Sequence, residues 1–306
     1  MAERDAEEDA GTNTRTSTKA KEAQSLGDED NAGPDPKKAG KAKSDHSYGY
    51  EEGILHDMGE VGRFSVKVLR ALPRAWMYPS EVFRQVGILI LGSSAVIILM
   101  EIILAAEIAL EGHYLLRQLG VGSYTGLFTS LGGYNVHPVM WGWILSSKVG
   151  CGLVAELGAM RISDEIDALE VMGIDSMVYL VGTRIWALII YTPFVAALFT
   201  GLSYIVYYLM NVLYFQSYSY GQFLDVHFGF ITWPDILAQI WHMYITGILI
   251  VLVACYYGYN ATGGPVGVGR NTAKSMIINL ALISLLGAVI NQFFFSGYGP
   301  RAPIAR

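Results

Sequence analysis

Apolar residues gather in long continuous runs along this chain instead of alternating with polar ones. A helix needs about 20 mostly apolar residues to cross a bilayer, and five runs reach that length. The third contains Pro193, a place where a helix can kink. The pattern predicts an all-α membrane protein with five transmembrane helices, at residues 86–110, 137–160, 180–210, 236–259 and 275–296.

Two segments of different character precede the first span. Residues 1–52 are rich in Ser, Gly, Asp, Glu, Lys and Pro and start with acids, without the apolar core of a secretory signal. They are predicted to form a disordered cytoplasmic tail. Residues 53–85 mix apolar with basic side chains and predict an amphipathic interfacial helix, interrupted near Pro73 and Pro79. The alternative is a helix packed across the bundle.

Composition agrees with a membrane protein. The chain has 306 residues, of which 52% are hydrophobic and 16% charged, with a mean hydropathy of +0.36 and a net charge of −6. These values exclude a soluble enzyme core, a basic nucleic-acid binder and a coiled coil. Cys151 and Cys255 both lie in apolar runs, where packing is a better interpretation than a disulfide or a metal site.

Lysine and arginine predict the orientation, because cytoplasmic segments retain positive charge. Most of these residues outside the tail lie before the first span or in the loops after the second and fourth spans. The N-terminus is therefore expected in the cytoplasm, with residues 299–306 as a short C-terminus on the far side of the membrane. Arg301 and Arg306 argue weakly against that placement.

The loop between the second and third spans carries signals for a short helix at residues 162–173. Ser163 can cap its start, Asp164 and Glu165 suit its positive end, and Gly173 can end it in a left-handed conformation. Its apolar and acidic positions predict either a docking helix for a soluble partner or an ordinary surface helix. The apolar positions are Ile162, Ile166, Leu169 and Met172, and the acidic ones Asp164, Asp167 and Glu170.

This loop also carries a family resemblance. The run AELGAMRISDEIDALEVMGID at residues 155–175 resembles the signature of the MlaE/YrbE permeases of ABC transporters. The likeness continues through GCGLVA at 150–155, YLVGTR at 179–184 and GVGR at 267–270. The long tail is most similar to that of YrbE-type permeases of actinobacterial Mce systems, which pair as heterodimers.

The resemblance implies an MlaE-like permease fold: an interfacial helix, then a five-span domain at residues 86–298. It implies a location in a bacterial inner membrane, with the C-terminus at residues 299–306 on the periplasmic side. It also implies a second permease subunit, a cytoplasmic ATPase dimer that binds ATP and Mg²⁺, periplasmic MCE-domain proteins and a lipid substrate. Lipid identity, transport direction and homo- or heterodimer pairing stay open. The coupling helix to the ATPase would use Ile162, Asp164, Glu165, Ile166, Asp167, Leu169, Glu170, Met172 and Gly173.

No catalytic motif is present. The chain lacks HExxH, GxSxG and CxxC, and its six His residues are scattered. The Gly-rich stretch 263–275 fails the phosphate-loop spacing, because Ala273 precedes Lys274 where a glycine is required. We therefore expect no enzyme activity, cofactor or metal in this chain.

Charged residues inside spans are expensive and are candidates for function. Glu101 and Lys148 are expected at similar depths, where they would pair or face a polar part of a lipid cavity; a structural pair between packed helices is the alternative. Such a pair also permits a second function, an ion-coupled secondary carrier using Glu101 and Lys148. The absence of a visible internal repeat speaks against that carrier.

Glu156 and Arg184 lie near the ends of the second and third spans, on the side of the docking loop. We expect them to form a structural clasp that transmits movement of the loop helix. Direct contact with the substrate is the alternative.

Overall fold

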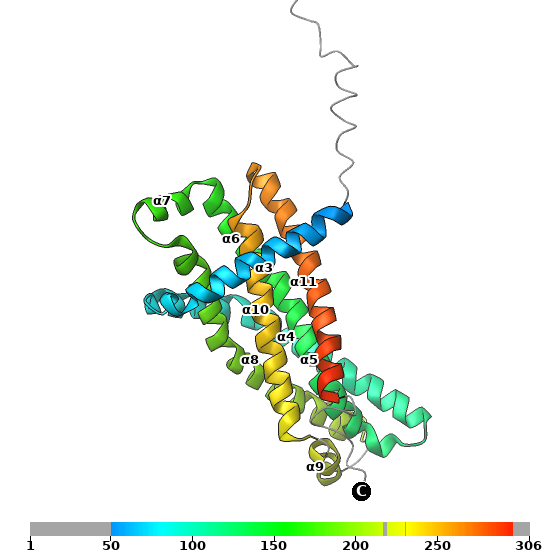
Figure 1. Cartoon of the computed structure of the whole chain (residues 1–306). Helices are drawn as coiled ribbons and strands as arrows, with labels where there is room; N and C mark the ends of the chain where they lie inside the picture. Colours follow the sequence, from blue (N-terminus) through cyan, green and yellow to red (C-terminus); the bar gives the residue numbers. More distant parts are fainter. Residues whose placement is uncertain (1–49, 217–218, 230, 296–306) are drawn as a thin grey trace, which may run out of the picture. The chain divides into compact units, whose positions relative to one another are not determined.

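The computed structural model describes residues 50–216, 219–229 and 231–295, and no strand occurs among them (Figure 1). The chain divides into two units, Met1–Met58 and Gly59–Arg306, and the helical bundle belongs to the second. The predicted tail lies outside the described residues, except that the first helix already begins at Tyr50. The predicted C-terminus at 299–306 also lies outside them.

Helical elements follow one another closely. In chain order they are α3 (Tyr50–Ala75), α4 (Pro79–Gln118), the 3₁₀ turn η1 (Gly122–Tyr124), α5 (Thr125–Leu145), the π-helical η2 (Ser146–Gly150), α6 (Cys151–Ile162), α7 (Glu165–Val171), the π-helical η3 (Met177–Gly182), α8 (Thr183–Tyr208), the π-helical η4 (Leu209–Tyr214), α9 (Tyr220–Gly229), α10 (Trp233–Tyr259) and α11 (Gly264–Phe295).

Four helical segments of the described residues are long and apolar enough to cross a membrane: Pro79–Gln118, Met177–Tyr214, Trp233–Tyr259 and Gly264–Phe293. The prediction of an all-α membrane protein is confirmed, and four of its five predicted transmembrane helices match these segments. The second predicted span lies in α5, η2 and α6, which run as continuous helix but fall short of that apolarity. Its sequence explains the difference, because Gly, Ser, His and Lys interrupt the apolar residues.

Two segments predicted as linkers are largely helical. The linker at 111–136 is divided between the end of α4 and the start of α5, and the Gly-rich segment before the last span forms the first turns of α11. Packing offsets the helix penalty of glycine there: Asn271 on α11 donates to the carbonyl oxygen of Tyr257 on α10 at 3.0 Å.

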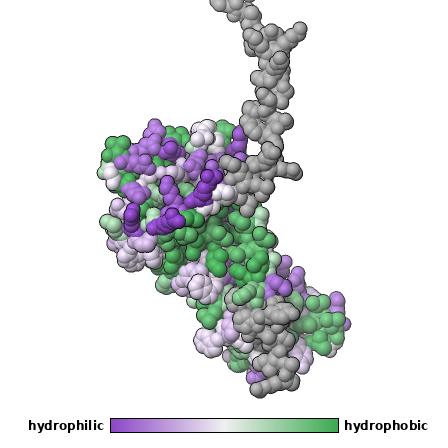
Figure 2. All heavy atoms as spheres, viewed as in Figure 1, coloured by the Kyte–Doolittle hydropathy of each residue, from purple (hydrophilic) through white to green (hydrophobic). Residues whose placement is uncertain are grey.

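Helix α10 is the centre of the bundle, since it contacts α5, α6, α8 and α11. In the most apolar stretch of α10, 56% of the residues are buried, compared with 22% in the corresponding stretches of α4 and of α11. Figure 2 shows the result on one face, an apolar band between two more hydrophilic ends. The apolar surfaces of α4 and α11 are therefore available to lipid or to a second subunit.

Helix α3 packs across one end of the bundle. Trp186 Nε1 on α8 donates to the carbonyl oxygen of Leu72 at 3.0 Å, and the Phe64 ring lies against that of Tyr256 on α10. The helix continues through Pro73, and Pro79 starts α4. One face of α3 therefore packs on the bundle, as the alternative predicted, while another face stays exposed.

Candidate functional site

The loop between α6 and η3 holds the short helix α7, which projects at the same end of the bundle as α3 (Figure 1). Its first turn differs from the prediction. Asp164, at φ 57°, precedes the helix in a left-handed conformation and makes no side-chain cap. Ser163 instead donates to the carbonyl oxygen of Ala159 at 3.0 Å and to Glu165 Oε1 at 2.9 Å, so it closes α6 and does not cap α7.

The last turn of α7 agrees with the prediction. Gly173 has φ +79°, and its N–H donates to the Glu170 carbonyl at 3.0 Å. The N–H of Ile174 donates to the Leu169 carbonyl at 3.0 Å. These two bonds form a Schellman motif, which needs a residue that tolerates positive φ.

The apolar positions of the loop do not form one docking stripe. Ile166 is fully buried in the main hydrophobic core, and Leu169 packs against that core. They anchor α7 to its own chain and are not available to a partner. The exposed apolar residues are Val171 at 88% and Met172 at 67%, with Ile162 at 39%. The sequence analysis missed Val171, because this residue does not fall at the helical spacing of Ile162, Ile166, Leu169 and Met172.

Acidic residues surround this exposed tip. Asp164, Glu165 and Asp167 are all exposed, and Asp167 pairs with Arg161 at 2.5 Å. Glu170 turns back to the body, where its Oε1 accepts hydrogen bonds from Ser176 at 2.6 Å and from Tyr259 at 3.2 Å. The tip therefore presents two apolar side chains beside a negatively charged rim.

Glu156 and Arg184 are brought together as predicted. Arg184 Nη2 on α8 donates to Glu156 Oε1 on α6 at 2.8 Å, and Arg184 Nη1 donates to the carbonyl oxygen of Leu180. The guanidinium is almost fully buried, whereas the Glu156 side chain is 47% exposed. This ion pair joins the helix that precedes the loop to the helix that follows it.

The predicted pairing of Glu101 with Lys148 is wrong. Lys148, in η2, is exposed, while Glu101 on α4 is completely buried. Similar depth does not place two side chains on facing sides, because rotation about each helix axis is independent of depth. The pairing that favoured an ion-coupled carrier is thus absent among the described residues.

Glu101 instead meets a residue that sequence reasoning missed. Its Oε1 lies 3.1 Å from His137 Nδ1 on α5, and His137 Nε2 lies 2.9 Å from the Tyr207 hydroxyl on α8. The apolar count started the second span at His137, whereas α5 begins at Thr125, so this histidine is well inside the helix. A span extended upstream would have placed it among the intramembrane candidates.

A cavity of about 230 Å³ opens beside this cluster, at the end of the bundle away from α7. His227 on α9, a helix outside the apolar spans, also lines this cavity. Burial lowers the pKa of its imidazole to about 4. Thr129 Oγ1 lies 3.4 Å from His227 Nδ1. The cavity thus combines aromatic walls with a few polar groups, as small-molecule sites commonly do. Its lining is Thr129, Gly133, Tyr134, His137, Thr200, Gly201, Ser203, Tyr204, Tyr207, His227, Phe228 and Gln239.

The long apolar helices are those of a multi-pass membrane protein. Residues 82–293 match the family Permease MlaE, and the chain belongs to that family.

Relatives agree with this assignment. A protein of Rickettsia bellii named "Probable ABC transporter permease protein" is 25% identical over 79% of this chain and 93% of its own length. A Synechocystis protein with the same description is 28% identical over 58% of this chain and 70% of its own. The chloroplast protein TRIGALACTOSYLDIACYLGLYCEROL 1 of Arabidopsis thaliana is 28% identical over 57% of this chain and 51% of its own.

Proposed function

We propose that this chain is the permease subunit of an MCE-associated ABC transporter that moves lipids across or between membranes of a cell envelope. A separate ATPase dimer would bind ATP and Mg²⁺ and drive the movement. The single observation that carries the proposal is the tip of α7, where exposed Val171 and Met172 project beside acidic side chains. An apolar anchor with charges that set register suits docking to a soluble subunit.

Movement of this tip has a route into the bundle. Ile166 holds α7 in the hydrophobic core, and the Glu156–Arg184 pair links α6 to α8. A push on α7 would therefore displace two membrane helices together. The cavity at the opposite end, beside Glu101, His137 and Tyr207, is where such a displacement would reach a bound lipid.

A lipid substrate suits the apolar surface of this chain. Acyl chains gain about 0.8 kcal/mol per buried methylene, so an apolar bundle needs few polar contacts to bind them. One relative carries a diacylglycerol lipid in its name. The exposed apolar faces of α4 and α11 support pairing with a second permease subunit. The YrbE-type assignment, the inner-membrane location and the cytoplasmic N-terminus are parts of the same proposal.

The test is purification of the tagged chain from native membranes in mild detergent, followed by mass spectrometry of the proteins and lipids recovered with it. We expect an ATPase, MCE-domain proteins and a second permease subunit. Val171→Asp with Met172→Asp is expected to remove the ATPase. The control is Leu119→Asp, since Leu119 is a similarly exposed apolar residue, 66%, at the other end of the bundle.

Two results would contradict the proposal. One is recovery of the folded chain without any ATPase, even after cross-linking through the α7 loop. The other is an ATPase that remains bound to the Val171 and Met172 variant as tightly as to the Leu119 control.

A further inference from the structure

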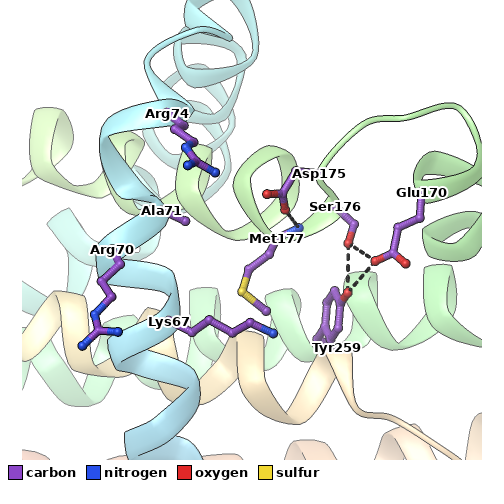
Figure 3. Close-up of a pocket in the computed structure, with 9 residues that line it drawn as sticks. All are labelled: Lys67, Arg70, Ala71, Arg74, Glu170, Asp175, Ser176, Met177 and Tyr259. Carbon is purple, nitrogen blue, oxygen red and sulfur yellow. Dashed lines mark hydrogen bonds between the residues drawn. The ribbon is translucent and has the colours of Figure 1, made fainter.

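A second cavity, of about 410 Å³, lies between α3 and the segment that joins α7 to η3. Its two walls carry opposite charge. Lys67, Arg70 and Arg74 come from α3, whereas Glu170 and Asp175 come from the opposite wall. Figure 3 shows Lys67 and Arg74 extending toward that opposite wall, while Arg70 points aside.

The position of this cavity follows from the three faces of α3. The buried face includes Phe64, Val68 and Ala75. A second face exposes the apolar side chains of Val66 and Leu69, and Trp76 and Met77, just after the end of the helix, are exposed as well. Basic residues recur at helical spacing on a third face: Arg63, Lys67, Arg70 and Arg74. A helix with exposed apolar and basic faces side by side lies in the membrane interface, with its cations at headgroup level.

The two walls do not neutralise each other. Among the residues that the structure describes, Lys67, Arg70 and Arg74 form no ion pair with an acidic side chain. Asp175 uses Oδ1 to accept from the backbone N–H groups of Met177 and Val178, at 3.2 and 3.3 Å. Glu170 likewise uses Oε1 for Ser176 and Tyr259. Each carboxylate therefore keeps its second oxygen for a further donor.

We propose that this cavity binds the headgroup of an aminophospholipid from the adjacent leaflet. The phosphate would meet Lys67 and Arg74, and the primary ammonium would donate to Asp175 and Glu170. The acyl chains would follow the exposed apolar face of α3. A choline headgroup has no N–H to donate, and an anionic glycerol headgroup brings no positive charge to the acidic wall. This inference does not depend on the transport function proposed above.

The experiment measures lipid binding to the delipidated full-length protein in detergent by native mass spectrometry. The probes are phosphatidylethanolamine, phosphatidylcholine and phosphatidylglycerol with identical acyl chains. We expect phosphatidylethanolamine to bind at least about fivefold more tightly than either of the others, a difference near 1 kcal/mol. Soluble glycerophosphoethanolamine should compete for the site, whereas inorganic phosphate at the same concentration should not.

Variants locate the site. Lys67→Gln with Arg74→Gln should weaken phosphatidylethanolamine binding by about tenfold. Arg63→Gln is the matched control, because Arg63 lies on the same basic face but does not line the cavity. Asp175→Asn should remove the preference for phosphatidylethanolamine over phosphatidylglycerol. The amide oxygen of Asn can still accept from the backbone N–H groups of Met177 and Val178.

Three results would overturn the inference. Tightest binding of phosphatidylglycerol would indicate attraction to negative charge alone. Binding of phosphatidylcholine as tight as that of phosphatidylethanolamine, or displacement by inorganic phosphate, would show that the ammonium group does not contribute to recognition. Equal effects of Arg63→Gln and of the Lys67 and Arg74 variant would place the lipid elsewhere on α3.

Discussion

Arg184 on α8 donates a hydrogen bond to Glu156 on α6 at 2.8 Å, across the loop that carries α7. The two residues differ in exposure, since the arginine is buried and the glutamate is half exposed. The arginine therefore depends on its partner more than the glutamate does.

Loss of the carboxylate is expected to destabilise the fold. Glu156→Ala should lower the free energy of unfolding by about 1–3 kcal/mol, because it leaves a buried guanidinium with only the Leu180 carbonyl. Glu156→Gln should cost less, since its amide oxygen still accepts. Unfolding titrations in mixed detergent micelles measure the difference. Glu111→Ala, at an exposed acid of α4, is the control and should change little.

The close approach of α3 to η3 requires a glycine. A Cβ at Gly182 would lie 2.7 Å from the Ala75 Cβ, so Gly182→Ala should cost about 1–3 kcal/mol of stability. Gly152 on α6 has open space around it, and Gly152→Ala should stabilise by up to about 1 kcal/mol through helix propensity. Opposite signs in thermal unfolding are the expected result. Two variants of equal stability would mean that α3 moves aside freely.

The end of α7 depends on backbone conformation. Gly173→Asn should be tolerated better than Gly173→Val, because Asn enters the left-handed region at lower cost than a β-branched residue. The cost of the Val variant is on the order of 1–2 kcal/mol, confined to the loop. Hydrogen exchange at the Gly173 and Ile174 amides measures it directly. Similar exchange in both variants would exclude strain as the cause.

The hydroxyl of Tyr207 is expected to stabilise the buried cluster. Tyr207→Phe removes the group 2.9 Å from His137 Nε2 and should cost about 1 kcal/mol. Tyr214→Phe, at a tyrosine 74% exposed, should be neutral. Unfolding in the same detergent for both variants gives the comparison, and an equal cost would show that the hydrogen bond contributes nothing.

Sequence reasoning placed the apolar helices well, because a bilayer demands long apolar runs that composition reveals directly. The ends were less predictable. Pro73 stays inside α3, and the Gly-rich segment before the last span is helical, because neighbouring helices stabilise what local propensity disfavours.

Side-chain pairing was the least predictable feature. The Glu156–Arg184 pair was found because both residues stand in recognisable motifs beside the same loop. Glu101 and Lys148 were matched by depth alone, which ignores rotation about the helix axes. The π-helical turn η2 contains Lys148 itself and shifts the helical phase there, an irregularity that apolar periodicity does not reveal.

Helix α4 is far longer than a membrane is thick. Its 40 residues extend about 60 Å at 1.5 Å per residue, compared with a hydrocarbon core of about 30 Å. Glu107, Glu111 and Arg117 fall in its last three turns, and because charged side chains are costly in lipid we expect these turns to lie outside the hydrocarbon core. Because α5 packs back against α4, with Phe128 against Gly112, the two helices form a hairpin beyond the apolar part of α4. Bilayer thickness thus acts on only part of α4, and the length of this hairpin sets how far the chain extends beyond the lipid surface.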